Sequence, residues 1–389
     1  MKNWKIILAI LTANVTLMSA GYTMLIPFLP MYLINELGVS LADVKLWNGA
    51  IFSVTFLLGG ILAPLWGKMA DTHGKKMMAI RASFGLAVSY YLGGIVTTPE
   101  EMFGVRVLQG FAAGLWSVCL AIATSFVPPE KLGVSLGFLQ SGLTCGCVIG
   151  PLLGGTLATV FGMRSSFFVA GTLLLLITLI FYFYIPEPPK VPVKEKEVPQ
   201  VHLLKRPIIR EILVYVGLGN MLILMIQPIL SLYVGDLSHG EGNIVFLAGF
   251  VFSLVGIAGA ITAPVWGRFG QSHGFYLSFI LSALLGGILD FIVALPDDLT
   301  WFCVTNFIYG LCCAGIQPSL SAILANNTES NQRGRVFGYM FSAQQFGAMV
   351  GPLLGGLIAT YFPLKTLFFV VGAIWITTSL IAYIRHGKE

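Results

Sequence analysis

Two charged side chains lie inside long apolar stretches of this sequence, where a charge could take part in chemistry. Arg106 lies in the stretch RVLQG, and Asp290 is the one acid well inside an apolar run. A charge in hydrocarbon is costly and is usually kept for function, so Asp290 is a candidate proton carrier. The simpler alternative for Arg106 is a static ion pair or a snorkelling contact. The simpler alternative for Asp290 is a carboxylate that reaches the outer surface of the membrane near Asp297 and Asp298.

Two further groups of residues are suited to loop closure and helix contact. The stretch GKMADTHGKK at 67–76 has a single anion, two glycines that allow close backbone approach and two lysines expected at the inner leaflet; the residues are Asp71, Gly67, Gly74, Lys75 and Lys76. Small residues at four-residue spacing, with one proline, form a stripe at Gly142, Gly146, Gly150, Pro151, Gly154 and Gly155. Such a stripe lets helices approach closely and bend, so it could serve as a contact, a hinge or both.

The composition indicates that these residues lie in a membrane protein. Hydrophobic residues make up 56% of the 389 residues and charged residues 10%, whereas soluble domains carry about 25% charged residues. The apolar residues form runs of about twenty, the length that a helix needs to cross a bilayer. Twelve spans are expected, at 6–33, 46–66, 79–97, 102–124, 133–160, 165–185, 212–234, 243–266, 275–295, 300–325, 335–361 and 365–384.

Basic residues indicate the orientation of these spans. With a cytoplasmic N-terminus, 18 of the 22 basic residues fall in cytoplasmic segments and three fall outside. This asymmetry follows the positive-inside rule and predicts that both termini are cytoplasmic. The longest polar stretch, at 187–210, contains proline and alternating charge and is predicted to be an extended linker.

The sequence also repeats itself. APLWGKMADTHG at 63–74 matches APVWGRFGQSHG at 263–274, and GPLLGG occurs at both 150–155 and 351–356. A duplicated six-span unit explains these matches. The expected fold is therefore all-α and integral to the membrane, with twelve transmembrane helices in two pseudo-symmetric six-helix bundles. The expected division is an N-terminal half at 1–186, a cytoplasmic linker at 187–210 and a C-terminal half at 211–389.

Together, the loop at 67–76, the buried arginine and the glycine stripe resemble the signatures of the major facilitator superfamily. The Gly-Pro-x-x-Gly-Gly part of the stripe resembles that of its twelve-span drug:proton antiporter branch. Within that branch, PFLPMYL at 27–33 and the early Trp47-x-Gly49 are similar to bacterial multidrug exporters of the fosfomycin and quinolone-resistance type.

The resemblance implies roles for particular residues. Asp71 would meet the start of span eleven near Gly334 to Phe337, where exposed N–H groups favour an anion, and would latch the cytoplasmic side shut. A solvated loop aspartate is the alternative. Arg106 would influence proton transfer. The matching residues of the second half, Gln271 and Asn306, are neutral, so the first half is expected to carry the charged switch.

The resemblance also implies that spans one, four, seven and ten line a substrate cavity, with help from spans two, five, eight and eleven. Aromatic rings attract lipophilic cations, and methionine adapts to varied shapes. The cavity candidates are Tyr22, Met24, Phe28, Tyr32, Phe56, Trp116, Gln140, Asn220, Met225, Gln227, Tyr309, Phe341, Gln344 and Gln345. Any one of these side chains could instead face lipid or another helix.

These features predict a proton-coupled secondary transporter that exports small amphiphilic drugs across a bacterial cytoplasmic (inner) membrane by alternating access. Its expected partners are the substrate, protons and membrane lipids, and the expected state is a monomer. Export of one dedicated metabolite, such as a siderophore or metallophore, is an alternative, as is nutrient uptake. A non-transporting membrane sensor is a further alternative, although no signalling domain is evident.

An enzyme is not expected. The sequence has no Walker-type GxxxxGK[ST] loop and no HExxH motif, so the proton gradient rather than a cofactor is the expected energy source. The net charge of +5 reflects membrane topology and does not indicate nucleic-acid binding. No metal site is predicted, because the cysteines lie in apolar spans without acidic or histidine neighbours in sequence: Cys119, Cys145, Cys147, Cys303, Cys312 and Cys313.

Overall fold

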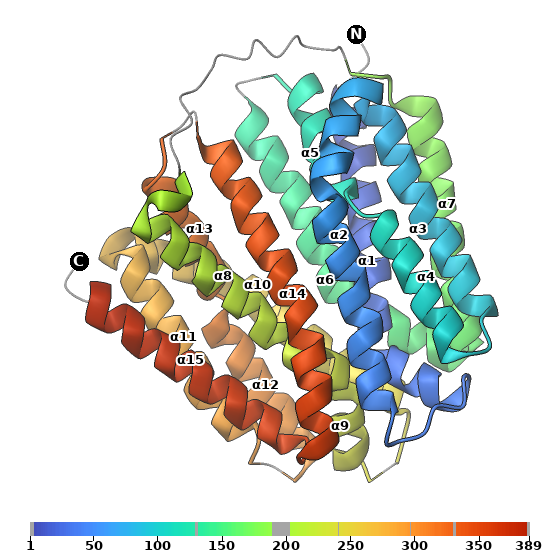
Figure 1. Cartoon of the computed structure of the whole chain (residues 1–389), viewed down its shortest axis with the longest axis vertical. Coiled ribbons are helices and arrows are strands. Elements are labelled where there is room, and N and C mark those ends of the chain that lie inside the picture. The colour runs from blue at the N-terminus through green and yellow to red at the C-terminus, as the bar shows by residue number, and fades with distance from the viewer. Residues whose placement is uncertain are drawn as a thin grey trace. The chain divides into compact units, whose positions relative to one another are not determined.

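The computed structural model describes residues 4–128, 131–188, 203–239, 241–295, 297–329 and 332–386, and these residues contain helices and no strand. Figure 1 shows the helices in chain order. The first half contains α1 (Trp4–Asn35), α2 (Val44–His73), α3 (Lys75–Ile95), α4 (Pro99–Phe111), α5 (Leu115–Phe126), α6 (Leu132–Phe161) and α7 (Met163–Tyr184). The second half contains η2 (Leu203–Lys205), α8 (Pro207–Ile226), η3 (Gln227–Ile229), α9 (Leu230–Leu237), α10 (Ile244–His273), α11 (Phe275–Val293), α12 (Leu299–Cys313), α13 (Ile316–Asn326), α14 (Arg333–Tyr361) and α15 (Lys365–His386).

Every predicted span corresponds to helical structure, and the predicted all-α membrane fold is confirmed. By length and hydropathy, ten stretches among the described residues qualify as membrane spans. The other two predicted spans are α3 and α14, with 21 and 29 residues. They are long enough to cross a bilayer but less apolar, because basic residues occupy their first turns and both contain several glycines together with serine.

Three predicted spans are not single helices, which corrects the sequence-based boundaries. Span four is divided into α4 and α5 at Gly114, whose φ of 104° is a left-handed conformation that glycine adopts readily. Span ten is divided at the corresponding place, between α12 and α13. Span seven is interrupted by the short 3-10 turn η3, which contains Pro228, a residue without a backbone N–H.

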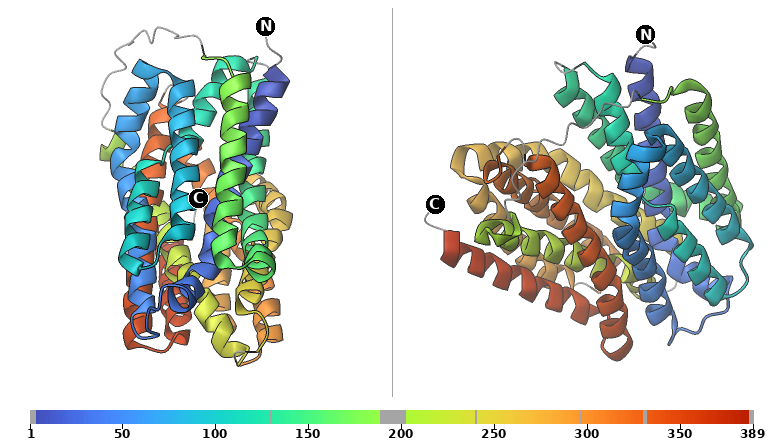
Figure 2. Two further views of the ribbon diagram at one scale, coloured as in Figure 1. Left: turned by 90° about the vertical axis from the view of Figure 1, so that its right-hand side faces the viewer. Right: turned by 45° about the horizontal axis from the view of Figure 1, so that its top comes forward.

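The repeat in the sequence is also a repeat of local structure. Helices α2 and α10 each have 30 residues and contain a proline at the same place, Pro64 and Pro264. Each is followed by a glycine of positive φ that separates it from the next helix, Gly74 at 107° and Gly274 at 95°. Matching helices also pair alike: α1 packs along α6 as α8 packs along α14, and α3 along α7 as α11 along α15 (Figures 1 and 2).

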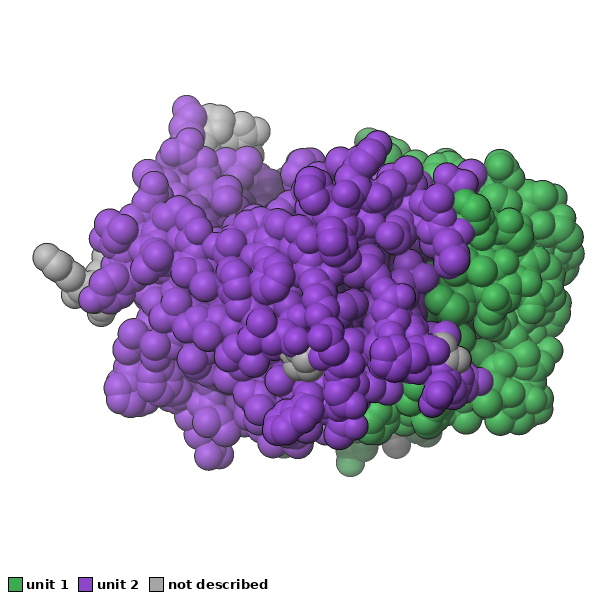
Figure 3. Space-filling model, turned by 90° about the horizontal axis from the view of Figure 1, so that it is seen from below, with its two compact units in different colours: residues 1–40, 54–194, 245–250 green, residues 41–53, 195–244, 251–389 purple. Residues whose placement is uncertain are grey.

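The contacts between residues group the chain into two compact units, coloured separately in Figure 3. Unit 1 comprises 1–40, 54–194 and 245–250, and unit 2 comprises 41–53, 195–244 and 251–389. Each unit therefore contains most of one half together with the start of one helix from the other: the first turns of α2 belong to unit 2, and those of α10 to unit 1. Most of the predicted linker lies outside the described residues, at 189–202.

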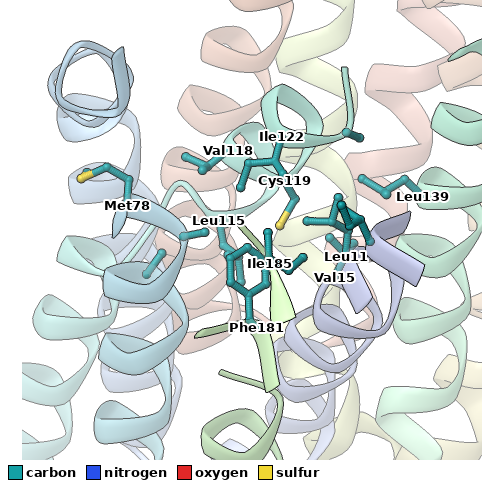
Figure 4. Close-up of a cluster of buried hydrophobic side chains, with 14 of the residues drawn as sticks. Leu11, Val15, Met78, Leu115, Val118, Cys119, Ile122, Leu139, Phe181 and Ile185 are labelled. Atoms are coloured by element: carbon teal, nitrogen blue, oxygen red, sulfur yellow. The ribbon is translucent and has the colours of Figure 1, made fainter. Parts of the chain in front are cut away.

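The core of unit 1 has a large apolar cluster at the ends of α1, α3, α5, α6 and α7 (Figure 4). Its side chains come from helices far apart in sequence and surround Phe181 and Ile185. The members labelled in Figure 4 are Leu11, Val15, Met78, Leu115, Val118, Cys119, Ile122, Leu139, Phe181 and Ile185. Their burial fixes these helix ends against one another.

Candidate functional site

Arg106 lies in a buried polar site of unit 1. The residue is 1% exposed, and its Nη1 donates a hydrogen bond to Gln109 Oε1 at 2.8 Å, one turn along α4. Thr55 Oγ1 on α2 donates to the Arg106 carbonyl at 3.2 Å. The phenol groups of Tyr22 on α1 and Tyr90 on α3 lie within electrostatic range of the guanidinium. Polar groups from four helices therefore gather around one buried cation.

Asp290 lies in a buried polar site of unit 2. The residue is 2% exposed on α11, and its Oδ2 has no hydrogen-bond partner among the described residues. Tyr309 and Cys313 of α12 lie within electrostatic range of the carboxyl group. Gly286, one turn earlier on α11, makes room for this contact, because a Cβ there would lie 2.6 Å from the Cys313 Sγ. The structure thus places Tyr309, a predicted cavity residue, beside the predicted proton carrier.

These two sites occupy matching places in the repeat. Residues 200 positions apart correspond: Tyr90 to Asp290, Arg106 to Asn306 and Gln109 to Tyr309. Packing supports the alignment, since Gly110 contacts Leu58 of α2 just as Gly310 contacts Ala258 of α10. Asn306 turns its side-chain amide to the Phe302 carbonyl of its own helix, at 2.9 Å. The matching sites therefore hold a cation on α4 in the first half and an acid on α11 in the second half.

The predicted latch loop at 67–76 lies at the junction of α2 and α3. Gly74 separates the two helices, and no atom lies within 4 Å of the position that a Cβ on Gly67 would occupy. Lys75 Nζ donates a hydrogen bond of 3.2 Å to a serine hydroxyl at the end of α5. The side chain of Asp71 lies outside the described residues, so its contact with the start of α14 stays a prediction.

Two residues near this loop were missed by the sequence analysis. Glu187 Oε1 accepts the backbone N–H of Lys76 at 3.3 Å, at the start of α3. The guanidinium of Arg81 stacks on Trp66, 3.7 Å from the ring centroid, and donates to the Ala113 carbonyl at 2.8 Å. Arg81 thereby supports the break between α4 and α5. The repeat drew attention to Trp66 but not to its partner, because the second half has leucine at the matching position.

The glycine stripe of α6 is a contact surface for two helices, α1 and α10. Toward α1, a Cβ on Gly150 would lie 2.5 Å from the Ala20 carbonyl oxygen, and one on Gly154 would lie 2.5 Å from that of Met24; Gly142 and Gly146 face the same helix. Toward α10, a Cβ on Gly155 would lie 2.9 Å from the Phe246 Cα. Helix α6 continues through Pro151 without a break. The contact role is thus visible, and the hinge role stays a prediction.

The predicted cavity residues differ in exposure within their units. Phe28 and Tyr32 are fully buried beside Phe167, with ring centroids 5.4 and 5.1 Å away, and the Tyr32 hydroxyl donates to the Gly93 carbonyl at 2.8 Å. The buried members are Met24, Phe28, Tyr32 and Met225; the partly buried ones are Tyr22, Phe56, Trp116, Asn220, Gln227, Tyr309, Gln344 and Gln345; Gln140 and Phe341 are exposed. Their role in lining a cavity stays a prediction.

Metal binding has no support in the part of the chain that the structure describes. There, no group of three or more histidine, cysteine or acidic side chains is placed to hold a metal ion. All six cysteines are free thiols, and Cys147 contacts the Ser19 hydroxyl at 3.0 Å.

Comparison with known proteins adds a family to this geometry. A model of the Major Facilitator Superfamily matches residues 11–270 and 225–388. The chain is 31% identical to a protein of Lactococcus lactis named "Multi-drug resistance efflux pump PmrA homolog", over 98% of this chain and 97% of that protein. It is 30% identical to "Multidrug resistance protein MdtG" of Salmonella heidelberg, over 96% of this chain and 93% of that protein.

Solved structures share the fold at lower identity. The inward-facing, occupied form of a bacterial homologue of the human lysosomal transporter Spinster has a TM-score of 0.84 at 13% identity, covering 98% of this chain and 96% of that chain. A mutant form of the nucleoside transporter NupG has a TM-score of 0.83 at 14% identity, covering 99% of this chain and all of that chain. These similarities concern the fold alone.

Proposed function

Because the chain belongs to the Major Facilitator Superfamily, we propose that it is a proton-coupled secondary transporter that exports small amphiphilic drugs from the cytoplasm by alternating access. The observation that carries this proposal is its similarity, along nearly the whole chain, to two proteins named for multidrug resistance. The glycine stripe supports export, because its Gly-Pro-x-x-Gly-Gly part resembles the antiporter pattern.

Asp290 is the proposed proton carrier. It is an acid buried in the second half, within electrostatic range of the Tyr309 side chain. Release of a proton from Asp290 would change its charge from zero to negative, and binding a proton would reverse that change. In a medium of low dielectric constant, such a charge has a strong effect on the packing around it. Arg106 would provide a buried positive charge at the matching place in the first half. The proton gradient supplies the energy, and no cofactor is required.

The proposed setting is a bacterial cytoplasmic membrane, with both termini in the cytoplasm and the transporter working as a monomer among lipids. The distribution of basic residues supports this orientation. Under this topology, the loop at 67–76 faces the cytoplasm, and the start of α2 and the end of α14 face outward. We use "outer end" for those helix ends below.

The proposal can be tested in everted membrane vesicles that hold a proton gradient reported by a fluorescent dye. Drugs of varied structure are added to vesicles with and without the protein. Drug-dependent loss of the gradient, across several chemical classes, is the expected result. Loss of the gradient with one metabolite alone would instead support a dedicated exporter. No response across a broad panel, from protein shown to be present in the vesicles, would contradict the proposal.

A further inference from the structure

The outer end of α2 makes a polar contact within unit 2 through two side chains that the matching helix α10 lacks. Lys45 Nζ donates a hydrogen bond of 2.7 Å to the Ala359 carbonyl of α14. One turn later, Asn48 Nδ2 donates a hydrogen bond of 2.6 Å to the Pro228 carbonyl in η3. Asn48 is fully buried. Both donors lie on the part of α2 that belongs to unit 2.

Both acceptors are carbonyls at places where the helical hydrogen-bond pattern ends or is interrupted. Ala359 lies in the last turn of α14, where carbonyls lack partners within the helix. The residue four positions later, which would otherwise supply the N–H, is Pro363. A lysine amine at a helix C-terminus also interacts favourably with the helix dipole. Lys45 therefore satisfies a carbonyl that the helix itself cannot.

Glycine contacts bring the backbones together around these bonds. A Cβ on Gly49 would lie 2.6 Å from the Pro352 carbonyl oxygen, and one on Gly356 would lie 2.5 Å from the Lys45 carbonyl oxygen. The contact of α2 with α14 is thus close enough for Lys45 and Asn48 to reach backbone acceptors. A larger side chain at either glycine would push the helices apart.

The matching contact in unit 1 has the glycines but not these two side-chain donors. There Gly249 of α10 lies against the Pro151 carbonyl, and Gly155 lies against Phe246. The residues 200 positions after Lys45 and Asn48 are valine and alanine, which have no polar side-chain atoms. The two side-chain donors are therefore present in one copy of the duplicated contact only.

We propose that Lys45 and Asn48 form a polar lock that holds the outer end of α2 against α14, and so sets how often the transporter opens to the outside. This inference rests on the proposed alternating access, in which the outer contacts of α2 and α10 break together. The lock makes the closed outer side more stable than glycine packing alone would. Both residues are positioning residues that need not touch substrate.

Two matched serines can report on this opening. Ser53 lies eight residues after Lys45 and four after Gly49, on the same face of α2, and is 3% exposed. Ser253 occupies the same place on α10 and is also 3% exposed. Ser53→Cys or Ser253→Cys is introduced into the full chain, and intact cells are treated with a membrane-impermeant maleimide. Peptide mass spectrometry then separates labelling at the new cysteine from labelling of the native ones.

Lys45→Ala and Asn48→Ala are each expected to speed labelling of both reporters about tenfold, since each removes one strong hydrogen bond to a backbone carbonyl. Lys45→Arg, which keeps a cationic donor, should restore slow labelling. Lys365→Ala is the matched control, because Lys365 also lies in unit 2 at the outer side but pairs with Asp297. It should change neither rate.

Unchanged labelling of Ser53→Cys in both alanine variants would overturn the lock. So would faster labelling of that reporter alone, because it would indicate local fraying of α2 without opening of the outer side. The two alanine variants remove different bonds, so unchanged labelling in only one of them would exclude that residue from the lock. Labelling needs no drug and no imposed gradient, so a failure of the lock is distinguishable from a failure of the proposed drug export.

Discussion

The helix ends that the proposed topology places at the cytoplasmic side, called the inner ends here, are built from opposite chemistry in the two halves. In the first half, Leu11 of α1 belongs to the apolar cluster together with Phe181 and Ile185. In the second half, the residue 200 positions after Leu11 is Glu211 of α8. Its carboxylate accepts a hydrogen bond from a tyrosine hydroxyl at 2.7 Å and lies 3.3 Å from the Arg385 guanidinium. The same position of the duplicated fold therefore carries an apolar side chain in one half and a charged side chain in the other.

The buried sites show the same freedom nearer the middle of the helices. The first half keeps Arg106 and a glutamine where the second has Asn306 and a tyrosine, and it keeps Tyr90 where the second has Asp290. Packing constrains which helices meet and where small residues are needed, and those features recur in both halves. The polar side chains between the helices differ between the halves. The first half therefore holds a buried cation, and the second half holds a buried acid.

The largest expected effect concerns the apolar inner end. Leu11→Ala should lower the free energy of unfolding by about 3 kcal/mol, because it leaves a cavity in a cluster that is closed to solvent. Thermal unfolding in detergent measures the change. The loss should not depend on salt concentration, because no charge is involved. An effect below about 1 kcal/mol would show that this inner end can collapse around the gap.

The next effect tests the buried cation. Arg106→Ala should reduce drug-dependent loss of the proton gradient about 30-fold, because it removes a charge held by a buried hydrogen bond. Asn306→Ala, at the matching place, should change the rate less than threefold, since its amide donates to a carbonyl of its own helix. Similar losses at both positions would contradict a special role for the cation.

The third largest effect is expected for Asp290→Asn, which should fold normally but export drug in a proton-coupled manner about ten times more slowly. Asparagine has nearly the same shape as aspartate but cannot carry a proton, so binding of drug should persist while coupling is lost. Drug binding and gradient collapse are measured on the same preparations. Asp297→Asn, at an exposed acid paired with Lys365, is the control and should keep wild-type transport. Full coupling in the Asp290 variant would exclude this acid as the carrier.

The smallest expected effect concerns the charged inner end. Glu211→Gln should destabilise the protein by about 1 kcal/mol, since the amide can still accept from the tyrosine but loses its charge interaction with Arg385. In contrast to Leu11→Ala, the difference between the variant and the parent should shrink as salt is raised. A salt-independent difference would mean that hydrogen bonding rather than charge holds this end.

Much of the fold could be predicted from the sequence because membrane insertion leaves a direct signature. The apolar runs predicted the helices, and the repeat of APLWGKMADTHG with APVWGRFGQSHG predicted the duplicated fold. The loop at 67–76, Arg106 and the glycine stripe predicted the family. The breaks at Gly114 and Pro228 were missed, since a glycine or proline in an apolar run can be a kink, a break or a contact. Only the neighbouring helices select among these.

By itself, the sequence determined the membrane class, the duplication and the residue types at Arg106 and Asp290, because each depends on composition or order along the chain. The tertiary structure decided which of those residues meet. It placed Tyr309 with Asp290, Arg81 on Trp66, and Lys45 at the end of α14. These partners are separated by 15 to 314 residues. No local pattern identifies such pairs, because helix packing rather than sequence spacing brings their side chains together.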